Sequence, residues 1–222
     1  MADQRARLID HFKRVYTIVV GLSITEACKR LFPFDFSDAL NPSVLMFVTF
    51  LVTVVPIFHG GDRSLDVKYL ENPPEKDTPW RRFLLMWDVF MLLITAIFFV
   101  GIALSMQGAH GIPTPSAFYF WMSRMLFFDC GVLIIDLLKT HLPRKLGHYL
   151  IWILLNFALG YMCLRASRSL GTSGSTSDDT TWWGWVIFGL AFLRTIIDYI
   201  VGAKFMFPSA TPSTDRGSPA IR

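Results

Sequence analysis

Six long apolar segments constrain this chain more than any other feature of its sequence. A helix advances about 1.5 Å per residue, so roughly 20 mostly apolar residues are needed to cross a hydrocarbon core about 30 Å thick. The chain has 222 residues, is 53% hydrophobic and only 17% charged, and has a mean hydropathy of +0.44. These values exclude an ordinary soluble domain, a disordered chain and a charged helical rod. The sequence therefore predicts an all-α fold, a polytopic helical membrane bundle.

The six predicted transmembrane spans differ in how clearly they stand out. They cover about residues 15–33, 43–59, 83–105, 117–138, 147–165 and 182–203. The second is short and contains Pro56, and the first is the weakest because Glu26, Lys29 and Arg30 interrupt its apolar run. Since charges and no small-residue cleavage site follow the first apolar run, we expect an uncleaved anchor and not a signal peptide.

The basic residues favour six spans with both termini in the cytoplasm. Lys and Arg that flank transmembrane helices concentrate on the cytoplasmic side. In this topology the inner segments hold fifteen of the 21 basic residues, the outer segments hold four, and Arg124 and Arg194 lie within spans. We expect a multi-pass protein of the plasma or inner membrane.

The segments outside the bilayer are too short for a further domain. The longest connection, residues 59–82, is below the roughly 40 residues under which a domain needs extra stabilisation. Residues 1–205 are predicted to form one transmembrane domain, and residues 206–222 a disordered cytoplasmic tail. Within the longest connection, Gly60 and Gly61 are expected to end the second helix, and residues 64–72 to form a short interfacial turn or helix.

Charged residues inside the predicted spans are the main functional candidates. A charge near the bilayer centre costs at least about 2.5 to 3.5 kcal/mol, so such residues face the bundle interior. The predicted ion pathway or intramembrane polar network consists of Asp129, Arg124, Asp88, Asp136, Arg194 and Asp198. Asp129 and Asp136 are seven residues apart and share a helix face. Three carboxylates near the inner end, with one or two arginines, predict a vestibule that attracts cations or exchanges protons.

Each of these residues also has a structural interpretation. Ion pairs can lock helices together, and we favour this role for Arg194 and Asp198, which can pair along one helix. Asp129 has no partner within reach on its own helix, which favours a functional role. Arg124 is rotated by about 140° from Asp129 and is expected to serve a different neighbour. Asn156 is expected to make an interhelical hydrogen bond.

The inner end of the second span is a candidate gate or hinge. Pro56, His59, Gly60 and Gly61 combine a kink, a titratable ring and a flexible joint within six residues. The alternative is an ordinary helix C-terminus, with His near the dipole and Gly as the cap.

The sequence contains no pattern typical of an enzyme. It lacks the zinc-protease, phosphate-loop, dinucleotide-binding and nucleophile-elbow motifs, so we expect no catalytic residue, no metal and no cofactor. Nucleic-acid binding has no support, because the cytoplasmic flanks account for the net charge of +4. Three cysteines exclude a disulfide framework. Cys28 and Cys163 are both expected near the outer surface, so the topology allows one disulfide between them.

Three functions remain, and the sequence favours an oligomeric channel or pore that conducts or senses ions. A six-span chain of 25.3 kDa has little room for an ion pathway inside one bundle. Copies of the bundle are therefore expected to form a pore at their shared axis. The second possibility is a small proton- or ion-coupled transporter with its site inside one bundle. The third is a non-conducting scaffold whose partner is another membrane protein.

Overall fold

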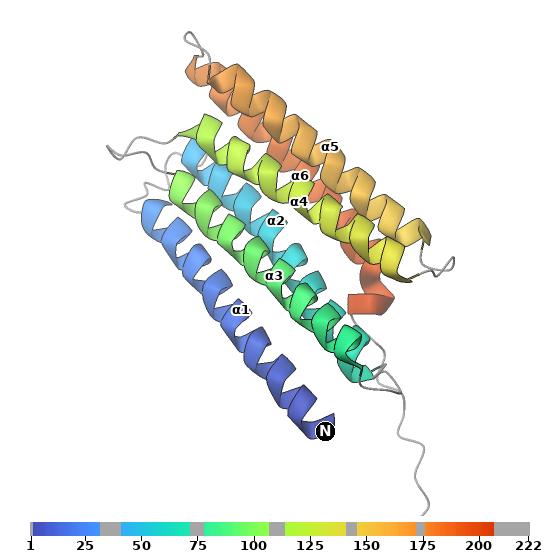
Figure 1. The fold of residues 1–222 in the computed structure, drawn as a ribbon. Coiled ribbons are helices and arrows are strands. Elements are labelled where there is room, and N and C mark those ends of the chain that lie inside the picture. The colour runs from blue at the N-terminus through green and yellow to red at the C-terminus, as the bar shows by residue number, and fades with distance from the viewer. Residues whose placement is uncertain are drawn as a thin grey trace, which may run out of the picture.

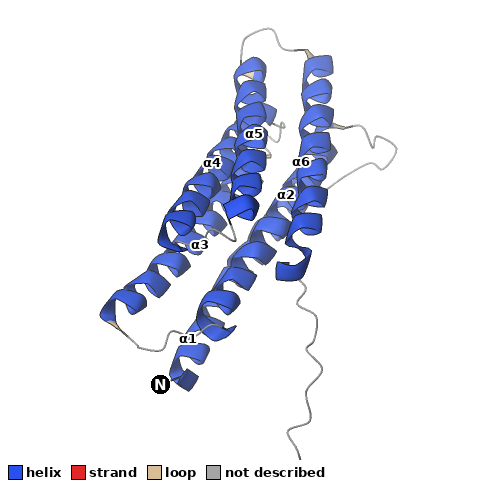
Figure 2. Cartoon of the chain, turned by 90° about the vertical axis from the view of Figure 1, so that its right-hand side faces the viewer, coloured by secondary structure: helices blue, strands red, loops and turns tan. Residues whose placement is uncertain are grey.

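All regular elements in the described part of the chain are helices (Figure 2). The computed structural model describes residues 2–31, 41–71, 78–106, 114–140, 146–171 and 176–206. The elements are α1 (Ala2–Leu31), α2 (Pro42–Leu65), η2 (Asp66–Glu71), α3 (Pro79–Ser105), α4 (Pro115–Thr140), α5 (Leu146–Leu170) and α6 (Ser177–Met206). The segment η2 is π-helical and follows α2 directly. The prediction of an all-α fold is confirmed.

Five of these helical elements are long and apolar enough to cross a membrane. They are α2 with η2, α3, α4, α5 and α6. The chain is therefore a multi-pass membrane protein. The helix α1 is not among the five, and Glu26, Lys29 and Arg30 lie near its end. The sixth crossing and the sidedness of the termini stay predictions.

The helices run side by side with alternating direction, so α1 begins at the same end of the bundle at which α6 ends (Figure 1). We call this end the inner end, because it carries the basic flanks that the predicted topology places in the cytoplasm, and the opposite end the outer end. The most extensive contacts join α4 to α5, α2 to α6 and α1 to α3. The predicted disordered tail lies outside the described residues except for Met206, which ends α6.

Local sequence explains why several helices begin before the predicted apolar spans. Prolines open three of them: Pro42, Pro79 and Pro115. Proline suits this position because the first helical N–H has no partner within the helix. At the start of α6, Thr176 Oγ1 accepts from the Asp179 backbone N–H at 3.2 Å, and Asp179 Oδ2 accepts from the Thr176 N–H at 2.9 Å. These reciprocal bonds satisfy donors that the first turn leaves open.

The helix α2 does not end at its glycine pair, contrary to the prediction. It continues through Gly60 and Gly61 to Leu65 and then into η2. A Cβ added at Gly61 would lie 2.6 Å from Leu92 Cδ2 of α3. Small residues at helix contacts let backbones approach closely in membranes. Gly61 therefore serves close packing of α2 on α3 and is not a helix cap.

Pro56 also lies inside α2, and the adjacent helix α6 replaces the hydrogen bond that this proline removes. Proline has no N–H, so the Val52 carbonyl one turn earlier loses its intrahelical donor. The Thr195 hydroxyl of α6 donates to this carbonyl at 2.8 Å instead. This bond keeps the helix continuous and ties α2 to α6 at mid-depth.

The outer half of the bundle is a packed apolar core. Its fully buried side chains include Phe50, Phe99, Met122, Leu126 and Ile187. A smaller cluster of Ile9, Leu65, Leu85 and Val89 joins α1, α2 and α3 nearer the inner end. Cys28, Cys130 and Cys163 are free thiols, so the bridge that the sequence left open between Cys28 and Cys163 is not formed.

Candidate functional site

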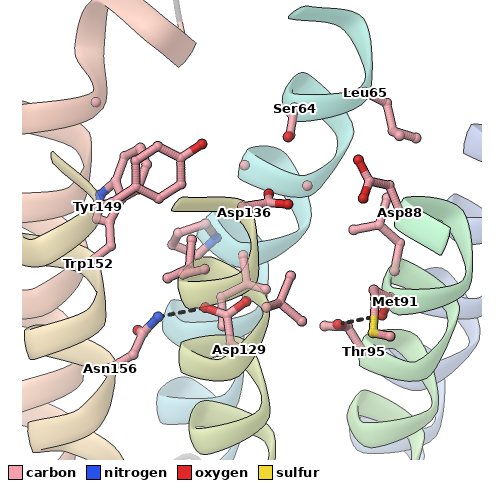
Figure 3. Close-up of a pocket in the computed structure, with 18 of the residues that line it drawn as sticks. Ser64, Leu65, Asp88, Met91, Thr95, Asp129, Asp136, Tyr149, Trp152 and Asn156 are labelled. Atoms are coloured by element: carbon pink, nitrogen blue, oxygen red, sulfur yellow. Dashed lines mark hydrogen bonds between the residues drawn. The ribbon is translucent and has the colours of Figure 1, made fainter. Parts of the chain in front are cut away.

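A cavity of about 420 Å³ lies in the inner half of the bundle and is lined by residues of every element from α2 to α6. The charged residues that line it are Lys68, Asp88, Asp129, Asp136, Arg194 and Asp198. Figure 3 shows the aspartates at two levels, with Asp88 and Asp136 nearer one end of the cavity and Asp129 deeper in the bundle. The rest of the wall is largely apolar and aromatic.

Most of the residues that the sequence selected meet at this cavity. Five of the six predicted network residues line it, and Arg124 is the exception. Of the predicted gate, Pro56, Gly60 and Gly61 line the cavity. His59 is not part of the lining, and its ring centroid lies 6.3 Å from that of Tyr199 on α6. The inner part of α2 and the intramembrane charges therefore belong to one site.

Arg124 lies on the outside of the bundle, apart from the other predicted network residues. Its side chain is exposed, and its guanidinium carbon lies 4.9 Å from the centroid of the Phe120 ring on the same helix. The rotation of about 140° that separates it from Asp129 accounts for this position. Asp129 points inward, and Arg124 points away from the cavity.

Two lysines balance the carboxylates at the inner end of the cavity. Lys68 Nζ lies 3.1 Å from Asp88 Oδ2 and 2.6 Å from Asp136 Oδ2, whereas Lys139 Nζ lies 3.0 Å from Asp88 Oδ1 and 3.7 Å from Asp136 Oδ1. The Tyr69 hydroxyl also donates to Asp88 Oδ2 at 3.0 Å. We call these five residues the inner ion cluster. It joins η2, α3 and α4 and carries no net charge, unlike the acidic vestibule that the sequence predicts.

Sequence reasoning missed Lys68 because it placed this residue in a cytoplasmic connection. The continuation of α2 into η2 returns Lys68 to the bundle, where it reaches Asp88 and Asp136. The clue in the sequence was the helical spacing of Leu65 and Tyr69, which share a face one turn apart. In the sequence, Lys139 has the position of a basic flank of the fourth span.

A second group of polar side chains lies deeper. Asn156 Nδ2 of α5 donates to Asp129 Oδ2 of α4 at 2.6 Å, and Arg194 Nε of α6 donates to Asn156 Oδ1 at 2.9 Å. Arg194 Nη1 lies 3.9 Å from Asp198 Oδ2. We call these four residues the deep polar network. The predicted interhelical hydrogen bond of Asn156 is confirmed, and the predicted pair of Arg194 with Asp198 is present at the limit of ion-pair distance.

Three hydroxyl groups lie buried on the outer side of the deep polar network. Within the described residues, the hydroxyls of Thr49 and Thr53 on α2 and of Ser123 on α4 have no hydrogen-bond partner. Thr17, Thr25 and Thr95, by contrast, each donate to the carbonyl four residues earlier in the helix. The packed outer core therefore contains polar groups whose hydrogen bonds this conformation does not satisfy.

Comparisons of the chain with protein-family models, with curated proteins and with solved structures found no match. Among the described residues, no group of three or more His, Cys, Asp or Glu side chains is placed to hold a metal ion. The cavity and the two groups of polar residues that line it are therefore the features that bear on function.

Proposed function

We propose that the chain is a small membrane carrier, which binds a solute inside one bundle and releases it unchanged at the other face. The observation that carries this proposal is the charged cavity of about 420 Å³ that lies between helices of a single chain. Sites for small molecules have volumes of about 300 to 1,000 Å³ and combine apolar walls with a few placed polar groups. In transporters such sites lie within the membrane, between helices.

The closed outer half of the bundle supports a carrier over an open pore. The core around Phe50, Phe99 and Met122 fills this half. The hydroxyls of Thr49 and Ser123 are buried there without a partner among the described residues, and they would meet water in a second conformation in which the outer half opens.

The inner ion cluster has the features of an inner gate. It links three elements at the end of the cavity, and the carboxylates of Asp88 and Asp136 are each only 12% exposed. Widening this end of the cavity would require Lys68 to leave one of the two carboxylates. Lys68 belongs to η2, and π-helical segments within helices occur frequently at functional sites.

The alternatives are less well supported by this geometry. A pore at an oligomer axis would place its polar residues on the outer surface of the bundle, whereas five of the six predicted residues line an internal cavity. The exposed Arg124 is the feature that agrees best with a homo-oligomer or a partner membrane protein. A pure scaffold could use these ionised groups to lock its helices together, but it has no need for a cavity of about 420 Å³ between them.

The carrier proposal is tested by thiol labelling from the two faces of proteoliposomes. The background is a cysteine-free chain with Cys28→Ser, Cys130→Ala and Cys163→Ala. One cysteine is then introduced, by Ser64→Cys in the cavity or by Thr49→Cys in the outer half. A membrane-impermeant maleimide should label the first variant from the inner face and the second from the outer face.

The decisive comparison adds Lys68→Met, which weakens the inner gate. A carrier opens at one face at a time, so labelling of Ser64→Cys should rise while labelling of Thr49→Cys falls. In a channel both rates rise together, and in a scaffold Thr49→Cys stays unlabelled from either face; either result contradicts the proposal. Arg14→Met is the matched control, because Arg14 pairs with Asp10 of its own helix at 2.7 Å at the inner end without lining the cavity. It should change neither rate.

A further inference from the structure

The charged groups around the cavity differ in balance between its two levels. In the inner ion cluster, two carboxylates face two ammonium groups, with every pair within 3.7 Å. This level is neutral when all four groups are ionised. It has no unmatched charge to offer a solute.

The deep polar network holds one carboxylate more than it can match. In the described part of the chain these two carboxylates, Asp129 and Asp198, share one guanidinium, that of Arg194, whose Nη1 lies 3.9 Å from Asp198 and whose Nε donates to Asn156, and His59 also acts on Asp198. Among the described residues, Asp129 accepts only from the neutral Asn156 amide and has no cation within ion-pair distance. The charged groups that act on Asp129 are Arg194, Asp198 and Asp136, and the charge of Asp136 is already matched by Lys68 in the inner ion cluster. A carboxylate buried without a direct cation is costly, and an added positive charge beside Asp129 would offset part of that cost.

The cavity walls around Asp129 suit the hydrocarbon part of an organic molecule. The indole rings of Trp87 and Trp152 and the phenol ring of Tyr149 line the cavity, together with apolar side chains such as Met91 and Leu133. Aromatic faces attract ammonium groups, and apolar walls bind hydrocarbon. The volume of about 420 Å³ exceeds what a single hydrated ion needs and is sufficient for a molecule with one ring.

We propose that the cavity binds a small monovalent organic cation, a protonated primary amine on an aromatic or aliphatic body, with Asp129 as its counter-ion. This proposal rests on the proposed function, because it takes the cavity as the solute site of the carrier. The ammonium group pairs with Asp129 at the deep level, and the apolar body lies between the aromatic walls. The inner ion cluster closes the cavity behind the solute.

Three probes of one shape test the charge preference on the unmodified protein. 2-Phenylethylamine, 2-phenylethanol and phenylacetate carry a positive, a neutral and a negative group on the same body. Titration calorimetry in detergent should show the amine binding at least about tenfold more tightly than the other two. A series of primary amines from propylamine to 4-phenylbutylamine covers the range of body sizes. Equal binding of the alcohol or the anion, or no saturable binding by any amine of the series, would overturn the proposal.

Variants assign the binding to Asp129. Asp129→Asn keeps an oxygen that accepts from Asn156 but removes the charge, so amine affinity should fall at least about tenfold while 2-phenylethanol affinity is retained. Asp198→Asn removes a charge from the same network and serves as the second variant if Asp129→Asn does not fold. Asp178→Asn, at the exposed start of α6, should change neither affinity. Unchanged amine affinity in a folded Asp129→Asn variant would refute the assignment. Because binding in detergent does not require alternating access, this result and the labelling result can fail independently.

Discussion

Replacing Asn156 by leucine removes the link between α4 and α6 at the level of Asp129. The side chain is 1% exposed, and its amide makes two hydrogen bonds, of 2.6 Å to Asp129 and 2.9 Å from Arg194. Leucine has a similar volume, so the main loss is the pair of hydrogen bonds and not the packing. Among the described residues, the variant leaves Asp129 with no hydrogen-bond donor and Arg194 with only the distant Asp198.

The magnitude follows from the two bonds. Hydrogen bonds between transmembrane helices contribute about 0.6 to 2 kcal/mol each. Bonds to ionised groups are the stronger ones, which places both near the upper part of this range. We therefore expect Asn156→Leu to lower the free energy of unfolding by about 2 to 4 kcal/mol.

Reversible unfolding by sodium dodecyl sulfate in mild detergent micelles measures this loss. Thr195→Val is the matched comparison, because it removes a single interhelical bond between neutral groups, from Thr195 to the Val52 carbonyl. It should cost about 1 kcal/mol. In an Asp129→Leu background the cost of Asn156→Leu should fall by about half, since one of its two partners is already gone. A loss no larger than that of Thr195→Val, or full additivity with Asp129→Leu, would refute the reasoning.

Three further predictions concern packing, charge and surface. Gly61→Leu forces a side chain into Leu92 and should lower the free energy of unfolding by about 1 to 3 kcal/mol, with partial rescue by Leu92→Ala. Burial lowers the pKa of Lys13, but hydrogen bonds to carboxylates such as Asp66 outweigh it and raise that pKa above its ordinary value of 10.5. The stability that Lys13 adds is therefore complete below pH 10.5 and is lost as the pH rises through the raised pKa, so unfolding curves of Lys13→Met and the unmodified chain should converge at high pH. Arg124→Gln should change the unfolding free energy of the bundle by less than about 0.5 kcal/mol, because Arg124 is exposed, and should leave amine binding intact.

The helices could be predicted from the sequence because apolar runs of membrane length have few alternatives to a helix. Their ends could not, since prolines and capping residues such as Thr176 and Asp179 extend helices beyond the apolar runs. The glycine pair at positions 60 and 61 read as a helix end because a glycine stop and a glycine at a close helix contact look alike in one sequence. The nearby Leu92 of α3, which decides between them, is known only from the fold.

The candidate site, like the helices, could be predicted only in part from the sequence. The cost of buried charge selected Asp129 and Asp136 correctly as residues that face the interior. Helical geometry also separated Arg124 from them, although it could not say what Arg124 faces. The balance of charge was not predictable, because Lys68 and Lys139 lie at helix ends, where a basic residue equally well marks the cytoplasmic side.

A disulfide that holds the outer half shut tests the central claim most directly. A Cβ at Gly184 of α6 would lie 3.5 Å from Leu45 Cβ of α2, within the range of disulfides, so Leu45→Cys and Gly184→Cys should form a bridge in the cysteine-free chain. The readout is labelling of Ser123→Cys from the outer face by an impermeant maleimide, followed by mass spectrometry. A carrier predicts at least about a tenfold loss of labelling with the bridge formed and recovery on reduction, because 1.4 kcal/mol against opening already gives that factor. Labelling at the same rate with the bridge formed would contradict alternating access between the two halves of the bundle.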